Sequence, residues 1–288
     1  MPGLRIVSYN IHKGRSMSGK DALYDLRLAL HHLRPDLLFL QEVQGRNEQR
    51  VSLDAQHESL AAALQLNAAY GCNAVRDMTD HGNALLSKFP ILSFENEDVS
   101  DHSLEQRGLL HAVVDIEGQE VHCFVVHLGL FGGGRIRQIE AMATRIRNMV
   151  PDDFPLLIAG DFNDWRDELA PLFVQQLGVH EVFASAPHTL GDKSRFHDSM
   201  RHLRRVFKGE QPLRLMGRSR HVDHHQLSMA GASAIKRPPK TFPAKFPMFR
   251  LDRIYQRGFA VRRAQVLRGR PWSVLSDHAP ILAELELS

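Results

Sequence analysis

Two short stretches of the sequence are apolar at every position, and they constrain the fold more than any other feature. Residues 37–40 and 154–159 are too short for ordinary helices, and each follows a segment with helical spacing of its apolar residues. A strand that is apolar on both faces has to be covered on both sides, as in α/β proteins. The chain is therefore expected to contain sheets whose faces are buried, with helices as part of the cover.

The same patterns extend along the rest of the chain. Apolar residues at helical spacing predict helices at residues 20–33, 57–66, 135–149 and 168–177. Alternating or continuous apolar runs predict strands at 4–9, 37–40, 84–87, 91–95, 109–116, 121–127, 154–159, 250–255, 260–267 and 281–287. Helices that alternate with strands, together with consecutive strands, indicate mixed sheets. No linker divides the pattern, so residues 1–288 are expected to form one domain.

Composition and cysteine usage favour a cytoplasmic globular protein. The chain is 43% hydrophobic and 24% charged, which is ordinary for a soluble domain. No apolar run approaches the roughly 20 residues that cross a bilayer, so no transmembrane segment is expected, and the first residues show no signal-peptide pattern. Cys72 and Cys123 are too few for a disulfide framework, and both are expected to be buried free thiols.

Positive charge is concentrated in residues 192–240. This segment holds twelve Lys or Arg and four Asp or Glu, whereas the rest of the chain holds 24 basic and 29 acidic residues. It is weakly periodic and is interpreted as an insertion within the domain. A basic stretch on an acidic body indicates contact with an anionic membrane or a nucleic acid, although a solvated loop would have the same composition.

Polar clusters lie beside the predicted strands. They occupy residues 8–12, 41–43, 127–129, 160–164 and 276–280, each taken as the end of a strand, and residues 251–253, which open one. Ligand sites of α/β proteins form at such strand ends. Many Asp, Glu, Asn and His side chains on one edge repel one another unless a cation or an anionic substrate is present. Because the set contains no thiolate, it favours Mg²⁺ or Mn²⁺ and the metal-assisted attack of water on a phosphoester.

The order of these clusters resembles the endonuclease/exonuclease/phosphatase superfamily, which includes DNase I, abasic-site endonucleases, neutral sphingomyelinases and inositol-phosphate 5-phosphatases. Four motifs resemble more closely a bacterial subgroup whose members are often encoded beside a cardiolipin synthase. They are Tyr-Asn-Ile-His-Lys-Gly at 9–14, His-Gly-Asn-Ala at 81–84, Gly-Asp-Phe-Asn-Asp-Trp-Arg at 160–166 and Phe-Arg-Leu-Asp-Arg-Ile-Tyr at 249–255. The resemblance implies a four-layer α/β sandwich of the DNase I type, with two mixed sheets packed face to face and helices outside.

The resemblance also implies a metal site. Glu42 corresponds to the principal ligand of the Mg²⁺ or Mn²⁺ ion, and Asn10 and Asp277 correspond to residues that complete or orient its shell. An isolated Asn at this type of position is more often a turn residue or a helix cap. The joint order of the motifs, rather than any single residue, carries the prediction.

Five further residues correspond to catalytic positions. Asp161 matches the residue that prepares the attacking water or handles the leaving group, and Asn163 matches one that holds a phosphate oxygen. His278 matches the histidine that faces the scissile phosphate, and Asp252 matches the carboxylate that orients it. His127 matches a second histidine of the DNase-like branch.

Three residues are predicted to bind substrate. Arg107 resembles a phosphate-contacting arginine of the DNase-like branch, and Asn83 and His12 are expected to line the site together with Asp80 and His81. Alone, each of these has an ordinary structural explanation as a core or turn residue.

The expected activity is metal-dependent hydrolysis of a phosphoester, most consistent with a phosphodiesterase. The substrate classes that remain open are a phospholipid, a nucleic acid and an inositol phosphate. The basic segment together with His127 and Arg107 favours a nuclease. The subgroup resemblance and the absence of Trp or Tyr from residues 192–240 favour a phospholipid. A catalytically silent protein that binds through the same fold is a further alternative.

Overall fold

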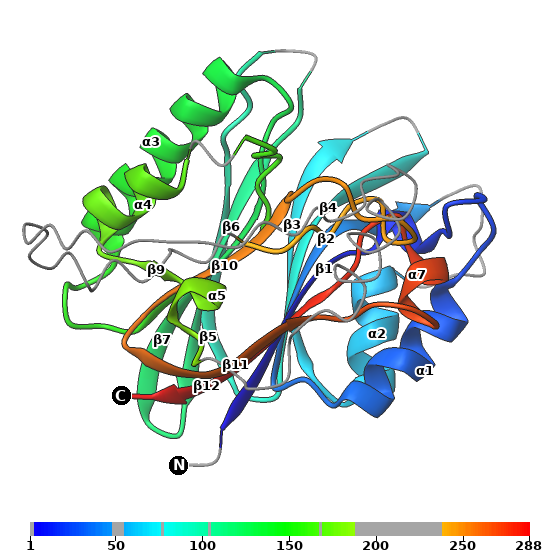
Figure 1. The fold of residues 1–288 in the computed structure, drawn as a ribbon, viewed down its shortest axis with the longest axis horizontal. Helices are drawn as coiled ribbons and strands as arrows, with labels where there is room; N and C mark the ends of the chain where they lie inside the picture. The colour runs from blue at the N-terminus through cyan, green and yellow to red at the C-terminus, as the bar shows by residue number, and fades with distance from the viewer. Residues whose placement is uncertain (1–2, 48–54, 76–77, 103–104, 167–168, 188–237) are drawn as a thin grey trace, which may run out of the picture. The chain divides into compact units, whose positions relative to one another are not determined.

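The computed structural model describes residues 3–47, 55–75, 78–102, 105–166, 169–187 and 238–288, and these residues form two sheets of six strands each (Figure 1). In spatial order, the first sheet consists of β11 (Phe259–Val266), β12 (Ile281–Leu287), β1 (Leu4–Asn10), β2 (Leu37–Asn47), β4 (Thr79–Ser87) and β3 (Asn67–Val75). The second consists of β5 (Ile91–Asp98), β6 (Gly108–Ile116), β7 (Gln119–His127), β8 (Leu156–Asp161), β10 (Asp252–Arg257) and β9 (His180–Glu181). Each sheet contains one parallel pair, β1–β2 and β7–β8, and its other pairs are antiparallel.

Helices cover the outer face of each sheet, as Figure 1 shows. The first sheet packs against α1 (Leu23–Leu33), α2 (Gln56–Leu64) and α7 (Trp272–Leu275), and the second against α3 (Gly132–Met149) and α4 (Ala170–Leu177). A short helix, α5 (Val182–Ser185), follows β9. The inner faces bury a shared apolar core that includes Ile6, Phe39 and Ile281 from the first sheet and Val125 and Ile254 from the second. The predicted four-layer α/β sandwich is confirmed.

The helix predicted at residues 20–33 begins later, at Leu23. The carboxylate of Asp21 accepts a hydrogen bond from the Leu23 backbone N–H at 3.0 Å, which satisfies a donor at the start of the helix. Arg34 then adopts a left-handed conformation and Pro35 prevents continuation, so α1 ends where the sequence predicts.

Two strands of the first sheet differ from the prediction. β3 was not predicted, because its sequence, Asn-Ala-Ala-Tyr-Gly-Cys-Asn-Ala-Val, is poor in the β-branched residues that favour strands. The strand is stabilised instead by its antiparallel pairing with β4. β2 runs well beyond residue 40, through an irregularity in its pairing with β4 between Leu40 and Val43. Because β3 is an edge strand, Cys72 is exposed, and the prediction that both cysteines are buried holds only for Cys123.

The topology brings the polar clusters to one edge of the sandwich. β1 and β2 are parallel, so the residues that follow Leu40 lie beside the end of β1. Residues 276–280 were predicted to end a strand, but they precede β12; because β12 is antiparallel to β1, its beginning reaches the same edge. In the second sheet, Asp252 opens β10 directly opposite Asp161 at the end of β8.

Residues 192–237 of the basic segment lie outside the described residues, so its role as an insertion stays a prediction. Within the part of the chain that is described, no helix is long and apolar enough to cross a membrane.

A pair of buried histidines on the second sheet should make stability depend on pH. His111 Nε2 lies 2.9 Å from His122 Nδ1, and the His111 ring stacks on Phe124. Burial, followed by the charges of His122 and Arg145, lowers the pKa of His111 to about 3, and burial also lowers the pKa of His122. Both rings are therefore neutral when folded but take up a proton when unfolded below pH 6.5, so stability is lost as pH falls from 6.5 towards 3.

We expect the wild-type protein to lose roughly 1 kcal/mol of unfolding free energy between pH 8 and pH 5 through this pair, a figure reduced for partial solvent access. His111→Gln should flatten that dependence in urea titrations at the two pH values, whereas His32→Gln on the exposed face of α1 should not. Equal pH dependence in wild type and His111→Gln would contradict the prediction.

Candidate active site

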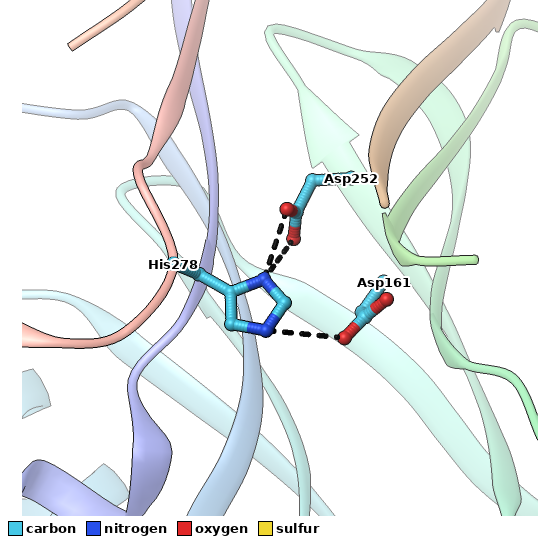
Figure 2. A group of neighbouring side chains, drawn as sticks. All are labelled: Asp161, Asp252 and His278. Atoms are coloured by element: carbon cyan, nitrogen blue, oxygen red, sulfur yellow. Dashed lines mark hydrogen bonds and ion pairs between the residues drawn. The ribbon is translucent and has the colours of Figure 1, made fainter. Parts of the chain in front are cut away.

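Three side chains from different elements meet at the edge where the strands end (Figure 2). The imidazole of His278 lies between two carboxylates: its Nδ1 is 3.0 Å from Asp252 Oδ2, and its Nε2 is 3.6 Å from Asp161 Oδ2. All three residues are buried. Burial lowers the pKa of His278, but Asp252 and Asp161 outweigh it and raise this pKa to about 10, so the ring is cationic at neutral pH.

Asp161 is the centre of this group. Its Oδ1 accepts the backbone N–H of Asn163 at 3.0 Å, and its Oδ2 accepts the Asn10 amide at 3.2 Å. Burial raises the pKa of Asp161 to about 6, against the opposing charge of His278. A carboxylate with this pKa, held by fixed donors, can accept a proton near neutral pH.

Asn10 links Asp161 to a second acidic residue. The Asn10 amide also donates to Glu42 Oε1 at 3.4 Å, and Lys13 Nζ lies 3.4 Å from Glu42 Oε2. Burial raises the pKa of Glu42, but the cationic forms of His127, Lys13 and His12 lower it, and it falls to about 2. Glu42 is therefore an anion at every physiological pH.

His127 is a second histidine next to Asp161, with its Nε2 3.6 Å from the same Oδ2 that His278 approaches. Arg107 Nη1 donates to His127 Nδ1 at 3.5 Å, so the ring proton is on Nε2 and faces the carboxylate. Burial and Arg107 lower the pKa of His127 to about 3. His127 is thus a neutral donor, whereas His278 is a cation.

The backbone is strained at four residues of this edge. His12, Lys13, Glu42 and Asn163 all have φ between 47° and 56°, the left-handed region that non-glycine residues rarely adopt. Among the described residues, the other non-glycine positions with positive φ are at ordinary helix ends or turns: Arg34, Gln65 and Glu117. Such strain concentrates at functional sites, where the surrounding structure holds it in place.

A cavity of about 370 Å³ opens beside Asp161 and His278. Its wall includes Glu42, Asp161, Asn163 and His278, and also Arg107 and His127. The Asn163 amide donates to the Leu128 carbonyl at 2.8 Å, which fixes its side chain in the wall.

Five predicted residues are not part of the cavity wall: Asp252, Asn10, Asn83, Asp277 and His12. Asp252 and Asn10 contact wall residues, His278 and Glu42 respectively. Asn83 is fully buried and donates to the carbonyls of Gly108 and Val125, tying the first sheet to the second. Asp277 Oδ1 lies 3.7 Å from His12 Nδ1 and accepts the Ser276 hydroxyl, so Asp277 and His12 form a partly exposed pair that does not line the cavity. Of the other two candidates, His81 lines the cavity and Asp80 bonds to Tyr70.

Sequence reasoning missed other residues of the cavity. Lys13 was quoted inside a motif but given no role, although the left-handed turn at 12–14 places it against Glu42. Trp165, Phe242 and Phe249 also form part of the wall. The unusual run Phe-Pro-Ala-Lys-Phe-Pro-Met-Phe at 242–249 was the available signal, since it is strongly apolar but suits neither a helix nor a strand.

Two donor sets at this site suit a divalent cation. Asp161, Asp252 and His278 offer ligand atoms that all lie within 4.8 Å of one another. Glu42 and Asn10 form the second set, since each side chain carries an oxygen. The Asn10 Nδ2 donates to Glu42 Oε1 at 3.4 Å, and the Asn10 Oδ1 accepts the His12 N–H at 3.1 Å.

Comparison with known proteins identifies the chain. The sequence profile of the Endonuclease/Exonuclease/phosphatase family matches residues 7–278. The chain belongs to this family. The predicted resemblance is therefore confirmed at the level of the family.

A curated relative and two solved structures extend the comparison. The uncharacterized protein YbhP of Escherichia coli strain K12 is 33% identical over 292 residues, which cover 98% of this chain and 96% of YbhP. An endonuclease/exonuclease/phosphatase from Bacteroides vulgatus is 15% identical with a TM-score of 0.69, over 100% of both chains. The mannosyl-6-phosphatase of Bacteroides thetaiotaomicron is 16% identical with a TM-score of 0.63, over 99% of this chain and 100% of its own. At these identities the two structures are evidence for the fold alone.

Proposed function

We propose that this protein is a Mg²⁺- or Mn²⁺-dependent phosphoester hydrolase, acting as a phosphodiesterase through an activated water. The observation that carries the proposal is the His278 imidazolium held between Asp252 and Asp161 at a cavity that also contains Glu42. A fixed cation beside a carboxylate that can accept a proton suits attack of water on an anionic phosphate. Membership of the Endonuclease/Exonuclease/phosphatase family supports this reaction class.

The cation is best assigned to Glu42 and Asn10, with Asp277 orienting the shell. His278 is cationic and its Nδ1 is occupied by Asp252, so it is a poor ligand despite its place in the compact group. Glu42 is anionic, and its carboxylate lies 3.4 Å from Lys13 Nζ. A single carboxylate of this kind suits a divalent ion that completes its coordination shell with water and substrate phosphate. The bound ion would polarise the phosphate and neutralise its charge.

The chain's own groups then divide the chemistry. Asp161 accepts a proton from the attacking water as the water oxygen bonds to phosphorus, and His278 Nε2–H donates to a phosphoryl oxygen as charge develops. The bond from phosphorus to the leaving oxygen then breaks, and the proton held by Asp161 passes to that oxygen. Asp252 keeps the His278 ring oriented and charged. Arg107 and Asn163 bind the remaining phosphate oxygens from the cavity wall. His12 and Asn83 do not line the cavity and act by positioning the residues they contact.

The test is turnover of bis-p-nitrophenyl phosphate and p-nitrophenyl phosphate with Mg²⁺, Mn²⁺ or EDTA. Metal-dependent hydrolysis favouring the diester is expected. Hydrolysis of the monoester alone would make the protein a phosphatase. No metal-dependent turnover of either would contradict the proposal and favour a binding protein.

Residues 192–240 are proposed to increase activity on a polyanionic phosphoester, whether phospholipid, nucleic acid or inositol phosphate, in a cytoplasmic setting. Replacing 192–237 with a short Gly-Ser link should retain turnover of the small diester but weaken action on the polyanion, because eleven Lys or Arg are removed. The wild-type advantage should fall steeply between 50 and 200 mM salt. Parallel assays on plasmid DNA, RNA, phosphatidylglycerol vesicles and inositol phosphates would identify the substrate. Unchanged polyanion activity and salt response would leave the segment as a solvated loop.

A further inference from the structure

A set of exposed apolar side chains borders the candidate catalytic cavity. We refer to Leu130, Phe131, Trp165, Phe246, Met248 and Phe249 as the apolar rim. Three of them, Leu130, Trp165 and Phe249, line the same cavity as His278, and the other three lie within three residues of these along the chain. Phe246 is 72% exposed and Met248 is 63% exposed. Exposed apolar side chains gathered at the mouth of a polar cavity indicate a binding surface.

Half of the apolar rim belongs to a loop that is tied to the catalytic histidine. The 241–250 loop, which precedes β10 in Figure 1, is closed by the pairing of Phe242 with Phe249. The Ala244 N–H donates to the Asp277 carbonyl at 2.7 Å, and the Ala279 N–H donates to the Thr241 carbonyl at 2.9 Å. These two bonds fix the loop on both sides of His278. A group that rests on the loop is therefore held at a defined place relative to the His278 ring.

The composition of the apolar rim favours lipid over nucleic acid. Leu130 and Met248 have no π-face on which a base could stack, and the Trp165 and Phe249 rings are inclined at 58° to each other. Aliphatic and aromatic residues together, with an interfacial Trp, are typical of surfaces that enter the boundary of a bilayer. Lys245 also suits a membrane surface, since it is exposed beside Phe246 and can face an anionic lipid headgroup.

Two cations of the described cavity wall, Lys13 and Arg107, each lie near a carboxylate. Lys13 Nζ lies 3.4 Å from Glu42, and Arg107 Nε lies 3.9 Å from Glu105. A polynucleotide needs a row of uncompensated cations to hold the phosphates that flank the scissile one. A lipid needs to present only its own headgroup phosphate to the cavity.

We propose that the apolar rim docks this protein on a lipid bilayer, with Phe246 and Met248 inserted at its surface and a phospholipid headgroup phosphate presented to His278. This inference rests on the proposed function in one respect, since the docked lipid is the phosphoester that the site would hydrolyse. Docking itself requires no turnover and is measurable in its absence.

The first experiment measures co-sedimentation of the full-length protein with vesicles in EDTA. Vesicles of phosphatidylcholine alone, or with phosphatidylglycerol, are compared at 0.1 and 0.5 M NaCl. Phe246→Ser combined with Met248→Ser should reduce partitioning at least about tenfold at both salt concentrations, because two large apolar side chains are lost from the inserted tip. The matched control is Leu92→Ser with Phe94→Ser, which changes two exposed apolar residues of β5 that do not line the cavity and should leave partitioning unchanged.

A second measurement needs no change to the loop. Trp165 and Trp272 are the two tryptophans of the chain, so Trp272→Phe leaves Trp165 as a single fluorescent reporter in the apolar rim. Its emission should shift to the blue when vesicles are added, and brominated lipids should quench it. Folding of each variant is checked by its thermal transition.

Several outcomes would overturn the proposal. They are absence of vesicle binding by the wild type, binding without quenching of Trp165, or equal binding by the Phe246/Met248 variant. Binding that disappears in 0.5 M NaCl would instead assign it to the basic residues 192–240. Loss of oligonucleotide binding by the variant, with vesicle binding intact, would assign the apolar rim to nucleic acid. Vesicle binding with no metal-dependent turnover would support docking and contradict only the proposed hydrolysis.

Discussion

Glu42→Gln should lower metal-dependent turnover of bis-p-nitrophenyl phosphate by at least about a thousandfold, the largest effect we expect from one substitution that preserves shape. The pKa of Glu42 is lowered to about 2, because the Coulombic effects of His127, Lys13 and His12 and the hydrogen bond from Asn10 outweigh its burial. The amide cannot provide the negative charge that a divalent ion requires. The left-handed backbone at residue 42 is retained, since glutamine differs from glutamate only at its terminal group.

Binding of the ion should be measured separately from turnover, by the Mn²⁺ electron paramagnetic resonance signal without substrate. Glu42→Gln should weaken Mn²⁺ binding by roughly tenfold or more, whereas Glu117→Gln, in the exposed turn between β6 and β7, should have no effect. Asp252→Asn distinguishes the two donor sets. If Asp252→Asn abolishes Mn²⁺ binding and Glu42→Gln does not, the ion belongs to the group of Asp161, Asp252 and His278.

Much of the fold could be predicted from the sequence, because the core strands are unambiguous. The continuous apolar runs that became β2 and β8 permit neither an exposed face nor a helix of ordinary length. β3 could not be predicted, because an edge strand that is only half-buried has no strong periodicity of its own. Its position depends on hydrogen bonds with β4, and these form between segments whose pairing is set by the tertiary structure rather than by the sequence of β3 itself.

The site was predicted residue by residue through motif order, and the structure adds the geometry. Asp252 lies 91 positions after Asp161, and His278 lies a further 26 positions along the chain. Strand pairing brings Asp252 opposite Asp161. Which residues face the cavity could not be read from the motifs. Asn83 and His81 belong to one tetrapeptide, yet Asn83 points between the sheets and His81 lines the cavity.

The aromatic residues of the cavity wall were missed for a different physical reason. Phe242 and Phe249 lie in a loop, where sequence patterns report neither burial nor contact. The Phe242 ring centroid lies 4.9 Å from that of His278, and two backbone hydrogen bonds fasten the loop to residues 277 and 279. Contacts of this kind depend on the folded edge of the sandwich and have no signature within the loop itself.

Asp252→Asn and His278→Gln should each reduce turnover of the diester by about a thousandfold, and the double variant should be within roughly tenfold of the weaker single variant. The reason is that the two side chains act as one unit. Asp252 contacts His278 Nδ1 at 3.0 Å and is the main cause of the raised His278 pKa, so without Asp252 the ring loses both its orientation and its charge. Removing the ring after that costs little more.

The measurement is a double-mutant cycle on kcat, with the thermal transition of each variant recorded because a buried charge left without its partner destabilises the fold. His102→Gln serves as the matched control, since His102 is partly exposed and lies outside the cavity wall. If the two losses multiply, to roughly a millionfold, Asp252 and His278 act on separate steps. In that case Asp252 would act on Asp161, which it faces across β8 and β10, rather than through the imidazole.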